Sequence, residues 1–415
     1  MESRRDPLAA NVQNVLLNFV RWLDGYGETS WDHQSYFAGN YGGWAKGLYY
    51  RHKLAGTMAV APMIFSEAFL PSARRLFHER MRLPIADAHY AMGFFFLHQS
   101  TAEPAYLARG VHFLECLKAT RCSGYKEYCW GYPFDWVTRD GIIFRETPLI
   151  TTTPYIFDAL LQATEIEARP EWTAILESIV RHVRTDIKDF PISDNASACS
   201  YTPDDQSRIV NAAAYRASLL TSASRKFGSD ECRSIAGRNV QFVLDQQNPD
   251  GSWPYAVGDV RDFVDHFHTC FVMKALAAIH QITGDPAILK ALRKGVDYYL
   301  ANLFAEDGLP RPFAKAPRLT VYKRELYDCA ECINLCLLLR DRFPEMNAKL
   351  QTVVAGILAD WVKPDGSFRS RQLLLGWDNV PMHRWAQSQM FRALGFYLFE
   401  AKRDPSGGKP QPSKN

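Results

Sequence analysis

Hydrophobic side chains recur at helical spacing along most of the chain, in two kinds of segment that alternate. The first kind is amphipathic. In residues 286–303, Leu289 and Val296 lie on one apolar stripe while charged residues lie off it, which is the pattern of a helix with one solvent-exposed face. Six such outer helices are predicted, at residues 11–24, 104–121, 171–188, 229–247, 286–303 and 345–362.

The second kind of segment is apolar almost all round. The stretch FHTCFVMKALAAIHQI (267–282) has no broad polar face, which indicates a helix with neighbours on every side. These inner helices follow the outer ones and start about 55 to 65 residues apart. They are predicted at residues 87–99, 153–166, 211–226, 267–282, 328–342 and 384–400.

Connections between the two kinds of helix differ in length. Inner-to-outer turns are short, and Pro104, Pro170 and Pro286 begin outer helices, where a missing N–H costs nothing. Outer-to-inner loops are long, as in residues 122–152. Six hairpins of this form close most easily into an all-α (α/α)6 toroid, with the long loops gathered on one rim around a central cavity.

We expect this toroid to be one domain, residues 1–402, followed by a disordered tail at 403–415. The long first connection, residues 25–86, is expected to add a helix near Phe65–Met81. Every inner helix would point its N-terminus at the loop-bearing rim. Free N–H groups there favour an anion by about 0.3–1 kcal/mol each, so an acidic sugar fits.

Composition narrows the function classes. With 47% hydrophobic and 22% charged residues the chain is globular, and a net charge of +3 without dense Lys/Arg clusters gives no indication of nucleic-acid binding. The most apolar window, Leu54–Leu70, contains Glu67 and is too short for an integral membrane segment. The start lacks an apolar leader and the nine cysteines show no paired CxxC spacing, so we expect a reducing, cytoplasmic location.

The fourth loop, residues 245–270, joins flat aromatic rings to acids and histidines. Trp253 and Tyr255 are candidates for binding substrate, and Asp265, His266 and His268 for catalysis. Asp265 also suits a helix N-cap, and residues two apart do not share a helix face, so at most one of the two histidines should face the cavity. The H-x-H spacing resembles a metal site, but nothing else completes a ligand set, and we expect neither a metal nor a cofactor.

The second loop, residues 124–141, is rich in aromatic rings. Six aromatic side chains crowd around Asp135, and sugar rings stack on Trp and Tyr faces. An acid among such rings can acquire a raised pKa suited to proton transfer, so Asp135 is a catalytic candidate. The substrate-binding candidates in this loop are Trp130, Tyr132 and Trp136.

Further polar or aromatic residues stand just before or within the first turn of an inner helix. Their repeated placement predicts side chains that face the cavity. Tyr201, Asn211 and Arg384 are catalytic candidates. The substrate-binding candidates of this group are Thr153, Asp328, Glu331, His383 and Trp385.

Three chemistries can be built from these residues. Glycoside hydrolysis needs two carboxylates, for which Asp135, Asp265 and Asp328 are available. Proton abstraction beside a uronate carboxyl would use Tyr201 or a histidine as base. Asn211, His266 or His268, and Arg384 would hold the carboxylate and stabilise the enolate. A sugar 2-epimerase could use paired histidines alone.

Several segments together resemble the VpsJ-type polysaccharide-biosynthesis family, whose members are often labelled δ-aminolevulinic acid dehydratases. The resemblance implies an (α/α)6 toroid of the six-hairpin glycosidase type that serves polysaccharide or glycan assembly, with no assigned reaction. The DGSW element is also similar to repeats of triterpene cyclases, although no D-x-D-D motif is present. The matching segments are CWGYPFDW (129–136), TPLITTTPYIFDALL (147–161), CSYTPDD (199–205), VNAAAY (210–215), QNPDGSWPY (247–255), VDHFHTCFVMKAL (264–276) and HRWAQSQMFRAL (383–394).

Together these features predict a carbohydrate-active protein of polysaccharide biosynthesis. Its expected partner is an acidic or linked saccharide, or another small molecule that contains a sugar, and its expected chemistry is that of a lyase, an epimerase or a glycosidase. Two other readings stay open: a glycan-binding scaffold without catalysis, and an isoprenoid-handling barrel that resembles a terpene cyclase.

Overall fold

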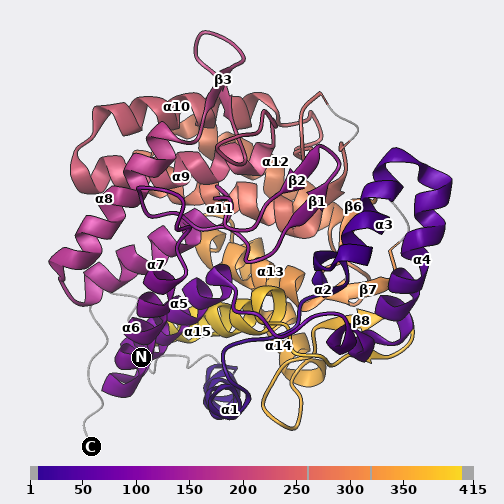
Figure 1. Cartoon of the computed structure of the whole chain (residues 1–415). Helices are drawn as coiled ribbons and strands as arrows, with labels where there is room; N and C mark the ends of the chain where they lie inside the picture. The colour runs from indigo at the N-terminus through magenta and orange to yellow at the C-terminus, as the bar shows by residue number, and fades with distance from the viewer. Residues whose placement is uncertain (1–7, 259–260, 318–319, 404–415) are drawn as a thin grey trace, which may run out of the picture.

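The chain forms an (α/α)6 toroid, as expected. Its computed structural model describes residues 8–258, 261–317 and 320–403 (Figure 1). The outer helices are α1 (Ala9–Tyr26), α6 (Pro104–Ala119), α8 (Pro170–Thr185), α10 (Asp230–Asp245), α12 (Pro286–Asn302) and α14 (Glu345–Asp360). The inner helices are α5 (Pro84–Thr101), α7 (Thr153–Ile166), α9 (Val210–Phe227), α11 (His266–Thr283), α13 (Leu326–Leu339) and α15 (Ser388–Lys402).

The inner helices form a closed ring. Each one packs against the next, and α15 packs back against α5. Outer helices bury one stripe only: in α8, Trp172, Ile175 and Ile179 are buried, while the opposite face carries charge. Burying each such side chain stabilises the fold by about 1.5–3 kcal/mol.

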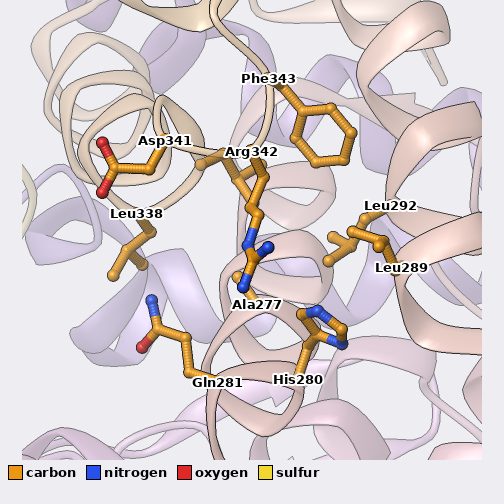
Figure 2. A pocket seen from close by; sticks show the side chains of 10 residues that line it. Ala277, His280, Gln281, Leu289, Leu292, Leu338, Asp341, Arg342 and Phe343 are labelled. Atoms are coloured by element: carbon orange, nitrogen blue, oxygen red, sulfur yellow. The ribbon is translucent and has the colours of Figure 1, made fainter. Parts of the chain in front are cut away.

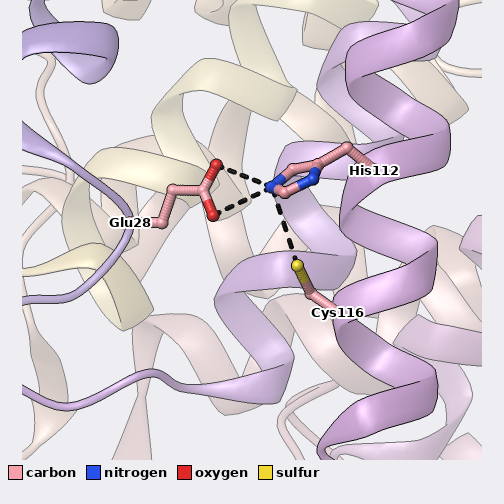
Figure 3. A group of neighbouring side chains, drawn as sticks. All are labelled: Glu28, His112 and Cys116. Atoms are coloured by element: carbon pink, nitrogen blue, oxygen red, sulfur yellow. Dashed lines mark hydrogen bonds and ion pairs between the residues drawn. The ribbon is translucent and has the colours of Figure 1, made fainter.

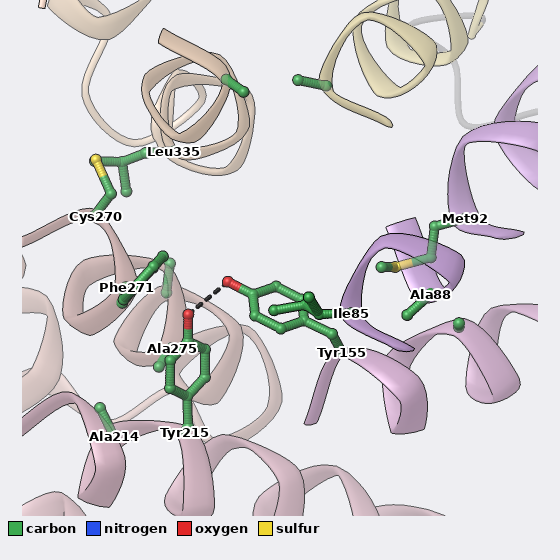
Figure 4. Close-up of a cluster of buried hydrophobic side chains, with 14 of the residues drawn as sticks. Ile85, Ala88, Met92, Tyr155, Ala214, Tyr215, Cys270, Phe271, Ala275 and Leu335 are labelled. Carbon is green, nitrogen blue, oxygen red and sulfur yellow. Dashed lines mark hydrogen bonds between the residues drawn. The ribbon is translucent and has the colours of Figure 1, made fainter. Parts of the chain in front are cut away.

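Aromatic side chains from three inner helices meet inside the ring. Tyr155 of α7, Tyr215 of α9 and Phe271 of α11 meet there, and the two tyrosine hydroxyls hydrogen-bond at 2.5 Å (Figure 4). Lys274 and Glu331 form a buried ion pair in the same interior. The interior of the ring therefore contains both apolar surface and paired polar groups.

Short strands lie on the long loops, which the all-α prediction did not include. Two of the small sheets join neighbouring loops: β5 pairs with β6, and β7 pairs with β8. These pairings tie the fourth loop to the fifth and the fifth to the sixth, which makes the rim a connected layer. The strands are β1 (Trp136–Thr138), β2 (Gly141–Ile143), β3 (Asp189–Pro191), β4 (Ser197–Cys199), β5 (Val264–Asp265), β6 (Phe313–Lys315), β7 (Tyr322–Glu325), β8 (Arg371–Leu373) and β9 (Trp377–Asp378).

The first connection differs from the prediction. The helix expected near Phe65–Met81 is wrong, because Pro71 follows the end of an earlier helix and starts a separate 3-10 turn. The connection instead holds a helical hairpin that projects beside the toroid (Figure 1). Its elements are α2 (Ser35–Ala38), α3 (Asn40–Arg51), α4 (Lys53–Phe69) and the 3-10 helix η1 (Pro71–Leu76).

Glycines allow this hairpin to pack tightly. A Cβ on Gly56 would lie 2.0 Å from the Tyr49 Cα, and one on Gly42 would lie 1.7 Å from the Tyr36 carbonyl oxygen. The glycine-rich sequence reads as a loop because glycine is a poor helix former. Here the same glycines are required for the close approach of two helices.

The last inner helix begins with an irregular turn. Residues His383–Gln387 form a single π-turn, η2, before α15 starts at Ser388. Such turns occur often at functional sites, because they displace side chains from regular helical positions. The predicted tail lies outside the described residues except for Arg403. Within the described part of the chain, no helix is both long and apolar enough to cross a membrane.

Buried charges fasten the base of the α3–α4 hairpin to the rim. Arg74 of η1 donates to Asp378 of β9 at 2.5 Å and to Glu67 of α4 at 3.0 Å. Arg371 of β8 donates to Glu67 at 3.2 Å and also pairs with Glu325 of β7. Burial outweighs both arginines at Glu67 and raises the pKa of its carboxyl to about 7.

This raised pKa predicts a pH-dependent difference between the wild type and Glu67→Gln. Below about pH 4.5 Glu67 is protonated in both the folded and the unfolded state. Between there and about pH 7 the unfolded chain loses the proton first, so the stability that Glu67 contributes falls as pH rises. Urea unfolding at pH 5 and pH 8 measures the free energy of unfolding of both proteins. Between these two pH values the wild type should lose roughly 3 kcal/mol relative to Glu67→Gln. An unchanged difference between the two proteins would contradict this assignment.

Candidate functional site

Half-buried aromatic rings gather where the long loops lead into the inner helices. The ring centroids of Tyr132 and Trp136 lie 5.6 Å apart, and those of Tyr255 and His268 lie 4.6 Å apart. The first pair comes from the second long loop, and the second pair comes from the fourth loop and the start of α11. We call the group the rim site and define it as Tyr132, Trp136, Tyr201, Tyr255, His268 and Trp385.

Further contacts link these side chains. The Phe267 ring lies 4.3 Å from the His268 ring and 6.5 Å from the Trp385 ring, centroid to centroid. Trp136 lies 6.3 Å from Tyr201, centroid to centroid. The Arg384 guanidinium lies 4.8 Å from the Tyr132 ring and 4.1 Å from the Trp385 ring. Flat apolar faces and a cation therefore stand side by side at the rim, an arrangement that suits a polar ring-shaped ligand.

His268 is the clearest candidate for chemistry at this site. Asp265 is the N-cap of α11 and accepts from the His268 backbone N–H at 2.9 Å, as the alternative role for Asp265 predicted. Its other oxygen lies 2.6 Å from His268 Nδ1. Because Asp265 is buried and His268 is 22% exposed, the carboxylate holds the ring from below. Donation from Nδ1 leaves Nε2 as a proton acceptor at the accessible edge.

His266 has a different role. Its Nδ1 lies 3.1 Å from the Leu303 carbonyl oxygen, and its Nε2 lies 2.8 Å from the Tyr299 hydroxyl. The ring is fully buried against α12. Only one of the two histidines thus reaches the rim, which agrees with the spacing argument.

Arg384 is occupied by a buried ion pair. Its Nε and Nη2 donate to the two carboxylate oxygens of Asp32 at 2.8 and 2.7 Å. Both side chains are almost completely buried. Arg384 therefore reaches the rim as a cation beneath Tyr132 and Trp385, and these two nitrogens are not available to hold a substrate carboxylate.

His33 belongs beside the rim site although the sequence did not suggest it. Its ring lies 4.2 Å from the Trp385 ring, and its Nδ1 lies 3.3 Å from Met382 Sδ. Burial, together with Arg371 and Arg384, lowers the pKa of His33 well below its usual value, so the ring is neutral near pH 7. The only signal was the Asp-His pair in the first connection, a segment that matched no pattern.

The three carboxylates considered for hydrolysis do not share a surface. Asp265 is committed to His268. Asp328 is buried with no partner for either oxygen among the described residues, and burial beside Glu325 and Asp265 raises its pKa well above the usual range. Asp135 sits before β1, 41% exposed, and accepts from the Arg145 backbone N–H at 2.8 Å.

Three of the other candidates lie in the core. Trp130 donates from Nε1 to the Leu117 carbonyl at 2.8 Å, and Trp253 donates to the Val243 carbonyl at 2.9 Å. His383 is buried, and burial lowers its pKa to about 3. These three side chains support the walls of the toroid and do not reach the rim.

The remaining candidates lie between the rim and the core. Tyr201 accepts from the Thr151 hydroxyl at 2.9 Å and forms part of the rim site. Thr153 and Asn211 are buried, and their side-chain oxygens have no partner among the described residues. Glu331 is buried with Lys274, below the rim.

A pocket of about 330 Å³ opens at the other end of the inner helices (Figure 2). It lies among the ends of α11 and α13 and the start of α12, and it is lined by His280, Gln281 and Arg342 among others. His280 follows His268 by twelve residues on one helix, which places them about 18 Å apart along the axis. The pocket is therefore separate from the rim site.

One group of side chains has the spacing of a metal site. Glu28, His112 and Cys116 come together outside the ring, with His112 Nε2 2.9 Å from Glu28 Oε1 and 3.6 Å from Cys116 Sγ (Figure 3). Arg82 also donates to Glu28 at 2.8 Å. Because the guanidinium already neutralises this carboxylate and repels a second cation, the arrangement suits an ion-pair network better than a metal.

Solved structures that share the fold of this chain include sugar-processing enzymes. A heparin-specific unsaturated glucuronyl hydrolase matches with a TM-score of 0.63 and 9% identity, covering 94% of this chain and 96% of that one. A polysaccharide lyase matches with a TM-score of 0.58 and 10% identity over 94% and 96% of the two chains. Cellobiose 2-epimerase from Bacillus thermoamylovorans matches with a TM-score of 0.60 and 9% identity over 77% and 88%.

The chain matches no protein-family model and no curated protein. At identities near 10%, the structural matches establish a shared architecture and leave the reaction open. The (α/α)6 toroid is therefore the level at which the chain can be classified from its similarity to known proteins.

Proposed function

We propose that the protein is a carbohydrate-active enzyme in which His268 transfers a proton at the rim site. The observation that carries this proposal is the Asp265–His268 pair, in which a buried carboxylate holds an accessible imidazole with Nε2 left as a base. The proposed substrate is an acidic or linked saccharide, and the proposed reaction is epimerisation or elimination.

The aromatic rings support a saccharide as the ligand. Tyr255 stands at 4.6 Å from His268, and Trp385 presents its ring beside the Arg384 cation. A sugar stacked on the Tyr255 ring would have its ring carbons close to the His268 imidazole. Stacking also tolerates many hydroxyl patterns, so the choice of sugar must come from hydrogen bonds at the edge of the site.

The chemistry follows from the tautomer of His268. Nε2 removes a proton from a carbon next to a carbonyl or carboxyl group, and the electron pair moves onto the oxygen to give an enolate or enediolate. Asp265 stabilises the imidazolium that forms and keeps its ring in place. In an elimination, the electron pair returns to expel the oxygen substituent on the next carbon. In an epimerisation, His268 keeps the proton that it removed, and a second group donates another proton to the opposite face of the same carbon.

Epimerisation requires a second proton-transfer group on the other face of the substrate. His33 is the proposed group, because contacts run from His268 through Phe267 and Trp385 to its ring. It would donate the proton as an imidazolium, and its lowered pKa makes that imidazolium a strong acid. In the reverse reaction His33 would act as the base. An elimination has no such requirement.

The arrangement supports the other readings less well. Hydrolysis by two carboxyl groups would need one protonated and one ionised acid on either side of a glycosidic bond, and Asp265, Asp328 and Asp135 are buried or placed apart. An isoprenoid-handling barrel would need a dry apolar lining, whereas the rim site contains the exposed edge of His268. The segments CWGYPFDW, VDHFHTCF and HRWAQSQM, which resemble the VpsJ-type family, all contribute side chains to the rim. The resemblance supports a role in polysaccharide biosynthesis.

Incubation of the full-length protein in D2O with a panel of reducing disaccharides and uronate oligosaccharides tests the proposal. We expect either deuterium at the carbon next to the carbonyl group, seen by NMR, or an unsaturated uronate seen by absorbance. New reducing ends without either signal would show hydrolysis and would contradict proton abstraction. Binding without any conversion across the panel would favour the scaffold.

A further inference from the structure

The α3–α4 hairpin exposes an unusual amount of apolar surface. Of the sixteen large hydrophobic side chains exposed in the described part of the chain, eleven lie between residues 41 and 77. Leu54, Met58 and Phe65 of α4 are 79%, 65% and 58% exposed. Soluble proteins rarely leave such a contiguous patch uncovered, so this surface is expected to have a partner.

The hairpin has little core of its own. Tyr36, Ala45 and Met63 form a small buried cluster that is separate from the main core of the toroid. In Figure 1 the two helices stand at the edge of the molecule, where α4 faces away from the ring.

The charge on this hairpin has one sign. From residue 33 to residue 66 the sequence holds no acidic residue, whereas Lys46, Arg51 and Lys53 are cationic. Arg51 and Lys53 flank the turn between the helices and are exposed. The next acid, Glu67, is buried. An anionic surface that lies on α3 and α4 would therefore meet no exposed carboxylate from these two helices.

We infer that the α3–α4 hairpin is a monotopic anchor that lies on the surface of a bilayer containing anionic lipids. Apolar side chains of α4 would enter the boundary between headgroups and acyl chains, and Arg51 and Lys53 would meet lipid phosphates. This inference is independent of the reaction proposed for the rim site.

Three details favour a lipid surface. Trp44, Tyr41 and Tyr50 are exposed on α3, and such rings prefer the membrane–water boundary. The Lys53 ammonium lies 3.7 Å from the Tyr49 ring centroid and donates to the Tyr49 hydroxyl at 2.5 Å, which keeps a positive charge at the tip of the hairpin beside these rings. At twelve and seventeen residues, α3 and α4 are about 18 and 26 Å long, which suits lying in the interface rather than spanning it.

A second copy of the chain fits this surface less well. A symmetric dimer through the hairpin would bring the same cations of both copies together without an acid from either hairpin to pair with them. Lipid phosphates supply the missing negative charge. The apolar patch and the cations would then both contribute to binding of the same anionic bilayer.

Vesicle flotation of the full-length protein tests the anchor. We expect binding to phosphatidylcholine vesicles that contain phosphatidylglycerol, and weaker binding to phosphatidylcholine alone or at high salt. The double variant Leu54→Glu/Met58→Glu should bind at least about 10-fold more weakly. Arg51→Glu/Lys53→Glu should lose about as much, but only on the anionic vesicles.

Matched substitutions elsewhere serve as controls. Ile192→Glu changes an exposed apolar side chain on the β3–β4 hairpin, and Lys290→Glu changes an exposed cation on α12, so neither should alter flotation. Thermal melts followed by circular dichroism check that all variants fold. Failure of the wild type to float with either vesicle would overturn the inference. So would a lipid-free dimer, seen by light scattering, that Leu54→Glu/Met58→Glu dissociates.

Discussion

Replacing His268 by glutamine is expected to lower turnover by about 10²- to 10⁴-fold, the range that a general base contributes. Glutamine keeps the size and polarity of the side chain but cannot take up a proton at Nε2. Because His268 is only partly buried and its main-chain contact with Asp265 remains, the melting temperature should hardly change. Steady-state kinetics on the substrate found in the panel, together with a thermal melt, measure both quantities.

Two further variants separate chemistry from structure. Asp265→Asn should lower turnover and displace the pH profile, because an amide does not stabilise the imidazolium, although it can still cap α11. His280→Gln changes a histidine at the far end of the same helix and should leave turnover unchanged. Loss of activity in His280→Gln equal to that in His268→Gln would show that the effect is not specific to the rim site.

Asp32→Ala is expected to destabilise the protein by about 3–5 kcal/mol, because it leaves the Arg384 guanidinium charged, buried and without its bidentate partner. The same change would release the end of the first connection that covers the rim near His33 and Trp385. Urea unfolding measures the loss. The double variant Asp32→Ala/Arg384→Met should recover much of it, since both charges are then absent.

An exposed ion pair provides the control for Asp32. Asp24 pairs with Arg109 on the outer surface, where both side chains are partly exposed. Asp24→Ala should therefore cost no more than about 1 kcal/mol. If Asp32→Ala were equally mild, the buried pair would not hold the first connection in place.

Local patterns were sufficient to predict the twelve helices of the ring. The expected inner helix at 267–282 is α11, His266–Thr283, and the expected outer helix at 286–303 is α12, Pro286–Asn302. Periodic apolar residues and prolines at helix starts are short-range signals, so they are readable in one sequence. Closure of the ring followed from the alternation of short turns and long loops.

Features that depend on distant contacts were not predictable in this way. The α3–α4 hairpin was missed because Gly42 and Gly56 read as loop residues until the helix that each one touches is known. His33 gained its place only through contacts with Trp385 and Met382, far along the chain. Strand pairs such as β7 with β8 join separate loops and leave no periodic trace.

At the rim, the sequence identified candidate residues, but it could not show which side chains are buried and which reach the surface. Trp130 and Trp253 have the composition of sugar platforms, yet each donates its indole N–H to a carbonyl of the preceding outer helix and is buried. Tyr132, Trp136 and Tyr255 lie only a few residues away and are half-buried at the rim. The difference is set by packing between elements, which one chain segment does not reveal.

A crystal structure of the full-length protein with a bound, slowly converted saccharide tests the central claim most directly. We predict a sugar ring stacked on an aromatic face of the rim site, with His268 Nε2 within about 3 Å of the carbon-bound hydrogen that is removed. A saccharide bound at the opposite end of the helices, beside His280 and Arg342, with the rim site empty, would contradict it.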